Sequence, residues 1–117
     1  MNKIELIGIV GSVRHTIVGD ARLCNFTLAT NYAYRDREGM PIIETTWHNC
    51  QHWENKGSSY PEALSKGDIV HVIGRLVSNR YIGADGSERC CFSVCAGSVE
   101  LVEADSLEIE ASDYVKG

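Results

Sequence analysis

The sequence predicts an all-β protein: a barrel of five strands, with one short helix between the third strand and the fourth. Three observations lead to this fold class. Five runs of the chain are rich in β-branched and aromatic residues. Turn-forming glycine, aspartate or proline separates one run from the next, and a helix signal follows the third run. A length of 117 residues supports one domain with one core.

The first two strands are predicted over residues 4–13 and 22–34. Apolar residues alternate through the first run until Gly11, which allows a bend. A Gly-Asp pair at residues 19–20 suits a turn before the second run. The charged segment 35–41 contains a glycine and a proline, so we expect it to form the loop that leads to the third strand.

The third strand is predicted over residues 42–53, and the helix signal comes directly after it. Within residues 57–67 a serine suits the N-cap, Pro61 suits the first turn, and Gly67 suits the position just past the last turn. This pattern predicts a short helix of about two turns.

The last two strands are predicted over residues 68–81 and 89–102, joined by a hairpin tip at 83–87 that carries an Asp-Gly turn signal. Three strands, a short helix and two strands is the order of an OB-fold, a five-stranded Greek-key barrel. The fold commonly binds oligonucleotides or oligosaccharides on its strand 2–3 face. We assign residues 1–102 to this domain and expect residues 103–117 to be an acidic, disordered C-terminal tail.

The negative charge of the chain is unevenly distributed. The formal net charge is −5, but up to residue 102 ten Lys/Arg face eleven Asp/Glu, and residues 103–117 hold five acids and one lysine. The predicted barrel is therefore almost neutral. A nucleic-acid partner remains compatible with this charge, although electrostatic binding should be weaker than on a basic surface.

Cysteine usage and the N-terminus bear on the cellular compartment. An odd number of cysteines without a CxxC pair argues against a disulfide framework or a structural zinc site. We therefore expect the cysteines to be reduced thiols in the core or in an interface. We also expect no cofactor. The five are Cys24, Cys50, Cys90, Cys91 and Cys95. No run approaches the roughly 20 apolar residues of a membrane helix, and the first residues lack a signal-peptide cleavage site. We expect a cytoplasmic protein with no membrane partner.

The third strand carries the most informative pattern. With a period of two, its odd-numbered residues share one face, where polar Asn49 and Gln51 separate Trp47 from Trp53. Large rings among polar neighbours indicate a partly solvent-exposed surface rather than a buried apolar core. A ring can stack on any unpaired base, at about 1–3 kcal/mol per base, so this face suits sequence-independent binding of single strands.

Other aromatic and basic residues near this face are candidates for the same site. Tyr34 and Tyr81 stand at the ends of neighbouring strands and offer further rings. Strict alternation places Tyr34 on the core side, so it needs a bulge or a loosened strand end to face the DNA. Basic side chains would neutralise phosphates without reading sequence. The candidates are Arg35, Arg37, Lys56, Lys66, Arg75, Arg80 and Arg89.

Six short motifs follow one another in order between residue 2 and about residue 102. They are Asn-Lys-Ile-Glu-Leu-Ile-Gly from residue 2, Asn-Phe-Thr-Leu-Ala-Thr from residue 25, Tyr-Arg-Asp from residue 34, Thr-Trp-His from residue 46, Lys-Gly-Asp from residue 66 and Gly-Arg-Leu from residue 74. In this order and spacing the chain resembles the bacterial single-stranded-DNA-binding proteins, the SSB family.

The resemblance implies roles for individual residues. It places Trp47, Trp53, Tyr34 and Tyr81 at base-stacking positions, and His48 at a subunit interface. It also implies assembly through symmetric dimers, usually into a tetramer. Further residues would contact phosphates: Lys3, Arg35, Arg37, Lys56, Lys66 and Arg80.

The sequence departs from the family pattern in two places. Val77 and Asn79 stand where the family often has arginines, which removes two phosphate contacts. The Gly/Pro/Gln-rich linker and the acidic tip ending in phenylalanine, through which the family recruits replication and repair proteins, have no counterpart here. Such losses fit a plasmid-, phage- or mobile-element-encoded version, or a specialised paralogue.

Three alternatives to binding and protecting single-stranded DNA in replication, recombination and repair follow from the sequence. The first is a primosome-type OB-fold adaptor that binds single strands weakly and bridges replication proteins. The second is an OB module for a sugar or a protein. The third is an enzyme, because Glu44, His48, Cys50 and His52 share a strand face. Ligands at every second residue of one strand, without a complementary cluster, make a poor metal or hydrolase site, so we expect no catalysis.

Overall fold

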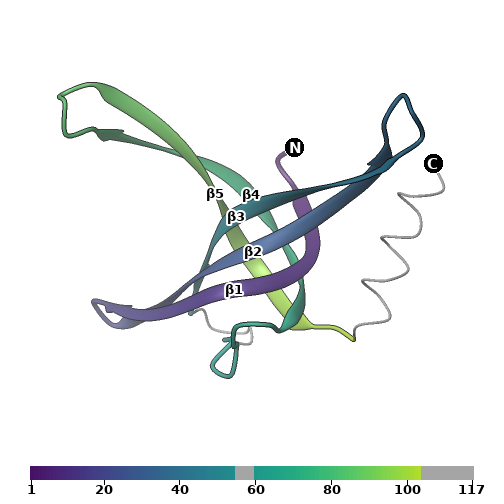
Figure 1. The fold of residues 1–117 in the computed structure, drawn as a ribbon. Coiled ribbons are helices and arrows are strands. Elements are labelled where there is room, and N and C mark those ends of the chain that lie inside the picture. Colours follow the sequence, from purple (N-terminus) through teal and green to yellow (C-terminus); the bar gives the residue numbers. More distant parts are fainter. Residues whose placement is uncertain (55–59, 104–117) are drawn as a thin grey trace.

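The structure, a computed structural model, describes residues 1–54 and 60–103 of the chain. Five strands make up its regular structure: β1 (Ile4–Val18), β2 (Ala21–Arg35), β3 (Pro41–Trp53), β4 (Ile69–Ile82) and β5 (Glu88–Leu101). They form one closed barrel in the order β1-β2-β3-β5-β4 (Figure 1). The predicted five-stranded OB-fold is confirmed.

Two long hairpins extend beyond the barrel. Figure 1 shows the β2–β3 hairpin and the β4–β5 hairpin leaving the barrel in different directions. Each is antiparallel along its whole length. The barrel closes between them through a short parallel contact, in which Cys50 pairs with Val94 and Gln51 with Cys95. Beyond that contact β3 and β5 separate, which opens the surface described below.

The core lies where the inward faces of all five strands meet. Its most completely buried side chains come from every strand, and they include two cysteines, as the sequence predicted. These side chains are Val10, Cys24, Leu28, Cys50, Val70, Val72 and Val94. All five cysteines are free thiols, and Cys90 and Cys91 are exposed on the β4–β5 hairpin. No helix within residues 1–54 and 60–103 is long and apolar enough to cross a membrane.

The predicted short helix is wrong for the part of it that the structure describes. From Tyr60 to Gly67 the chain forms turns. The amide of Leu64 reaches back only three residues, to the carbonyl of Pro61, and Gly67 takes a φ of +94° that reverses the chain toward β4. The Asp68 carboxylate also accepts from the amide of Ser65. Side-chain and glycine turns therefore satisfy this backbone before a helical turn can propagate. Residues 57–59 of the predicted helix lie outside the described residues.

Strand β1 is longer than predicted. Residues 14–18 continue it into a hairpin with β2, where His15 pairs with Cys24 and Val18 with Ala21. The predicted bend at Gly11 is a β-bulge, because the register with β2 shifts between Val10 and Ser12. A bulge places two residues of one strand opposite one residue of its partner.

Candidate nucleic-acid interface

The outer face of β3 carries the two tryptophans. Trp47 is 60% exposed and Trp53 is 41% exposed, whereas Cys50 and His52 of the intervening stretch are buried. The predicted alternation of β3 is confirmed. Directly opposite residues of antiparallel strands share a face, so Ala29, the partner of Trp47 on β2, lies on this outer face too. A small neighbour leaves the indole room to lie across β2.

The indole of Trp47 reaches as far as β1 and lies over Gly11. A Cβ placed on Gly11 would come within 2.4 Å of Cζ3 of that ring and within 2.8 Å of Thr27 Oγ1. Gly11 is the extra residue of the β1 bulge, so the bulge and the absent side chain together create the space that the ring fills. One edge of the indole is therefore held against backbone, and the exposed part faces solvent.

A groove of about 430 Å³ runs across the outer face beside Trp47. Its lining includes the polar residues Asn25 of β2 and Asn49 and Gln51 of β3. Arg14 of β1 lines it on one side, and Phe92 of β5 lines it on the other. The residues of β3 that the sequence placed between the two tryptophans thus belong to a continuous depression. Its lining combines hydrogen-bonding groups, one cation and two phenylalanines, of which Phe26 is buried and Phe92 is exposed.

Arg14 is a groove residue that the sequence reasoning missed. Strict alternation along β1 from Val10, whose side chain is buried, would send Arg14 inward. The bulge at Gly11 inserts one residue, so Arg14 pairs with Asn25 and points to the outer face. The glycine was the available signal, because a glycine inside a strand often marks a bulge.

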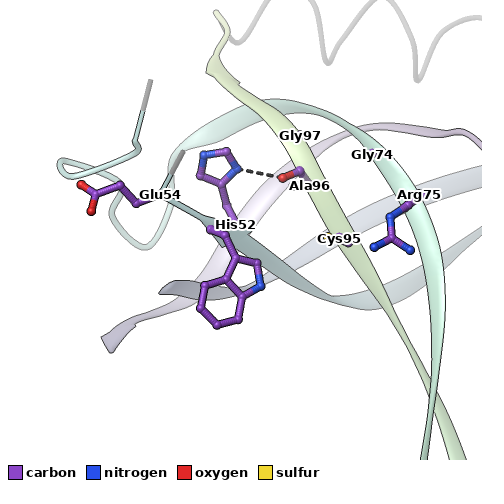
Figure 2. A pocket seen from close by; sticks show the side chains of 8 residues that line it. His52, Glu54, Gly74, Arg75, Cys95, Ala96 and Gly97 are labelled. Atoms are coloured by element: carbon purple, nitrogen blue, oxygen red, sulfur yellow. Dashed lines mark hydrogen bonds between the residues drawn. The ribbon is translucent and has the colours of Figure 1, made fainter. Parts of the chain in front are cut away.

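A second cavity of about 410 Å³ is lined by Trp53 and by the buried His52. Arg75 of β4 lines it, as do Glu54 and the backbone of β5 around Ala96. Figure 2 shows Arg75 and His52 on opposite sides of this cavity, with Ala96 between them. The buried His52 donates from Nδ1 to the Ala96 carbonyl at 2.8 Å and so ties β3 to β5. Trp53 therefore has a neighbouring cation in Arg75.

Tyr34 lies on the other side of the β2–β3 hairpin. The pairing of β2 with β3 runs from Leu23 to Arg35 without a register shift, so the bulge that Tyr34 would need is absent from this hairpin. Its hydroxyl donates to Glu44 at 3.2 Å, and partial desolvation together with this bond raises the pKa of Tyr34. The ring of Tyr32 stands 5.8 Å away. The structure consequently does not bring Tyr34 together with Trp47 on one face.

Tyr81 lies near the end of β4, on the β4–β5 hairpin, and is 49% exposed. It pairs with Arg89 of β5 and shares the alternation of Asn79, which lines the groove beside Trp47. The predicted stacking positions therefore fall on both hairpins and on the barrel face between them.

The candidate cations differ in their electrostatic surroundings. Arg80 stands 3.4 Å from Glu88, and Arg89 stands 3.4 Å from Asp85, so each shares its charge with a carboxylate. A further set is exposed and makes no ion pair within the described part of the chain: Lys3, Arg14, Arg35, Arg37, Lys66 and Arg75. Lys56 lies outside the described residues.

His48 faces away from the tryptophans. It lies on the inward alternation of β3, half-buried, and Nε2 of its ring lies 2.8 Å from Thr30 Oγ1. Desolvation lowers the pKa of His48, which favours the neutral ring. The face it shares with Cys50 and His52 does not form a metal site, since no group of three or more His, Cys, Asp or Glu residues could hold an ion in residues 1–54 and 60–103.

The comparisons with known proteins agree with this geometry. The model of the single-strand binding protein family matches residues 1–102. The chain belongs to this family. Single-stranded DNA-binding proteins of Neisseria meningitidis are 32% identical over the whole chain, which covers 68% of their length. That of Bacillus cereus is 33% identical over 88% of the chain, and the chain spans 61% of it.

Solved structures share the fold. A Plasmodium falciparum SSB in complex with single-stranded DNA superposes with a TM-score of 0.75 at 24% identity, covering 88% of this chain and 96% of that one. A deletion mutant of the single-stranded DNA binding protein from Thermus aquaticus gives a TM-score of 0.74 at 21% identity, covering 89% of this chain and 51% of that one. These two similarities support the OB-fold barrel.

Proposed function

We propose that this protein binds and protects single-stranded DNA without sequence preference, in DNA replication, recombination and repair. Bases stack on exposed aromatic rings, and nearby cations neutralise phosphates. The role requires neither catalysis nor a cofactor. Family membership supports the ligand, and the site on the outer barrel face supports the way in which it is held.

One observation carries the proposal: two exposed indoles on one strand, with polar amides between them. Trp47 and Trp53 are six positions apart on β3, which in an extended strand is about 20 Å. A dry protein contact would be expected to surround such rings with apolar side chains. Here the intervening Asn49 and Gln51 face the same groove and offer hydrogen bonds to whatever passes over them. Unpaired bases supply both a π-face and polar edges.

The cations of the outer surface complete the proposed site. Arg14 borders the groove beside Trp47, and Arg75 borders the cavity beside Trp53. Each ring therefore has one neighbouring guanidinium for a phosphate. We assign the remaining phosphate contacts, as the family resemblance suggests, to Lys3, Arg35, Arg37, Lys56, Lys66 and Arg80.

The two tyrosines extend the proposed path onto the hairpins. Tyr81 continues it along the β4–β5 hairpin. Tyr34 lies on the reverse side of the β2–β3 hairpin, so a strand that leaves Trp47 must pass around the edge of that hairpin to reach it. The path proposed here therefore bends around the protein rather than crossing a flat face.

We further propose that the protein is a homo-oligomer, a dimer or a tetramer, that acts in the cytoplasm. The position of His48 on the side opposite Trp47 supports an interface there, because subunits could associate on that side without covering the groove. Light scattering with and without a dT oligomer would give the number of subunits and the number of nucleotides that each oligomer covers.

Substitution of the tryptophans tests the proposal. Trp47→Ala and Trp53→Ala should each weaken binding of a fluorescently labelled dT oligomer by about 1–3 kcal/mol, measured by anisotropy, while leaving the melting temperature nearly unchanged. Ile17→Ala is the matched control, because Ile17 is 75% exposed near the end of β1 and lines neither cavity. If both tryptophan variants bind like the wild type, base stacking on β3 is wrong.

The adaptor alternative is favoured by one observation, the pairing of Arg22, Arg80 and Arg89 with carboxylates. Fewer free cations should give weaker binding to each nucleotide. An adaptor would cover few nucleotides per oligomer, whereas a protein that protects single strands would cover many. The same light-scattering titration separates the two roles.

A further inference from the structure

The β4–β5 hairpin exposes a phenylalanine at the place where the barrel opens. Strand β5 pairs with β3 at Val94 and Cys95. From this contact toward the tip of the β4–β5 hairpin the two strands separate, as the diverging hairpins of Figure 1 show. Phe92 comes two residues before Val94 on β5. Val94 is 2% exposed, but Phe92 is 60% exposed. The change is local: at Phe92, strand β5 is no longer covered by a neighbour on its β3 side.

The residue paired with Phe92 across the hairpin is small and polar. This residue is Ser78 of β4, which cannot cover an aromatic ring. Next to this pair, Asn79 donates to the hydroxyl of Ser93 at 3.0 Å. A phenyl ring that is 60% exposed contributes little to the barrel core, since most of its surface stays in water.

Phe92 lines the groove that also holds the polar residues between the tryptophans. Asn49 and Gln51 line it on β3, and Arg14 lines it on β1. Strands β2 and β3 lie between β1 and β5 around the barrel, so Arg14 and Phe92 border the groove from opposite sides of these two strands. The groove thus has a cation on one rim and a ring on the other.

We infer that Phe92 is a further base-stacking residue, which holds a nucleotide of the single strand in the groove while Arg14 holds a phosphate across from it. This inference rests on the proposed binding of single-stranded DNA. The polar residues of the lining argue for a nucleotide as the occupant, because a second copy of the chain that buried Phe92 would also have to desolvate Asn49, Gln51 and Arg14. A base can stack on the ring and leave these groups hydrogen-bonded.

Three variants of Phe92 separate stacking from apolar packing. Phe92→Ala should weaken binding of a labelled dT oligomer by between about 5-fold and 150-fold. Phe92→Leu should weaken it similarly, since leucine keeps the apolar bulk without a π-face, and Phe92→Trp should restore it. Ile82→Ala is the matched control on the same hairpin: Ile82 is 70% exposed and does not line the groove.

Thiol protection gives an independent measurement without removing the ring. Cys91 lines the same groove, whereas Cys90 pairs with Arg80 on the hairpin. Bound dT oligomer should slow the reaction of Cys91 with a maleimide in the Cys90→Ser variant.

The outcomes distinguish this inference from the proposed function. If wild type binds no dT oligomer, the proposed function fails and the inference fails with it. If wild type binds and Trp47→Ala weakens binding, but Phe92→Ala and Phe92→Leu bind like wild type, only the inference is overturned. It is also overturned if light scattering shows that Phe92→Ala lowers the number of subunits, because the ring then belongs to an interface between copies.

Discussion

Replacement of Gly11 by alanine should weaken DNA binding without unfolding the barrel. A Cβ on residue 11 would lie 2.4 Å from Cζ3 of Trp47, whereas ordinary contact begins at 3.4 Å, so the edge of the ring must withdraw by about 1.0 Å, the difference between the two. The Gly11 backbone does not take a positive φ, so the substitution meets a steric obstacle and no backbone strain. The nearest atom belongs to the far end of a side chain that can move, and Thr27 Oγ1, at 2.8 Å, would also have to shift.

The expected loss is part of what removal of the ring would cause. A displaced indole still offers a π-face, so Gly11→Ala should cost less than the about 1–3 kcal/mol of Trp47→Ala, on the order of 0.5–1 kcal/mol. Alanine in a strand also gains roughly 0.5–1 kcal/mol over glycine from the lower entropy of the unfolded chain. That gain offsets the cost of moving the ring and of any shift of Thr27 Oγ1, so the melting temperature should change little.

A double-mutant cycle is the appropriate assay. Anisotropy of a labelled dT oligomer would give the affinities of wild type, Gly11→Ala, Trp47→Ala and the double variant. If Gly11 acts through the ring, Gly11→Ala has no further effect once Trp47 is alanine. An equal loss of affinity in both backgrounds would refute the reasoning, because Gly11 would then act through β1 or the bulge itself.

Three further predictions concern charge, pH and thiol reactivity. Glu88→Gln frees Arg80 from its carboxylate partner and should steepen the dependence of log Kobs on log salt by up to about 0.7 per subunit, measured over a salt series with dT oligomer. No change of slope in that series would exclude Arg80 as a phosphate contact. Burial lowers the pKa of His48 below its ordinary value of 6.5, so the unfolded chain binds a proton at His48 more readily than the folded protein does. The contribution of His48 to stability is therefore present above pH 6.5 and is lost as the pH falls below 6.5. Urea midpoints at about pH 7.5 and about pH 5.5 should therefore differ less in His48→Gln than in wild type, and an equal difference would contradict the assignment. Burial raises the pKa of Cys50 to about 12 and also raises the pKa of Cys24. A thiol reagent should therefore label the exposed Cys90 and Cys91 in the native protein, but Cys24 and Cys50 only after denaturation. Mass spectrometry of the labelled peptides can verify this.

The face of β3 could be predicted because its pattern is local. Along this strand each residue alternates without interruption, so the sequence alone places Trp47 and Trp53 outward and Cys50 inward. The same reasoning holds for β2, where Tyr34 follows the inward alternation as expected. To face outward, Tyr34 would need a bulge at the end of β2, but the register of β2 with β3 is continuous and contains no bulge.

The rest of the groove depends on contacts between distant parts of the chain. Arg14 faces outward only because a bulge at Gly11 shifts the register of β1. Phe92 is exposed only because β5 leaves β3 after two residue pairs, and no feature of β5 alone reveals where that happens. The turns from Tyr60 to Gly67 likewise depend on the link of Gly67 to the carbonyl of Val10 on β1. Local propensity cannot include such tertiary constraints.

The balance of rings and charges bears on how this protein would distinguish single strands from duplex DNA. Duplex DNA offers closely spaced phosphates but no free base faces, so its attraction to a protein is mainly electrostatic. In this chain Arg22 is held between Glu54 and Glu62, and both Arg80 and Arg89 share carboxylates, which lowers that attraction. Stacking on exposed rings is unaffected by these carboxylates and is open to unpaired bases alone. Weak cationic contacts combined with strong aromatic ones should therefore raise the preference for single strands, even where total affinity is modest.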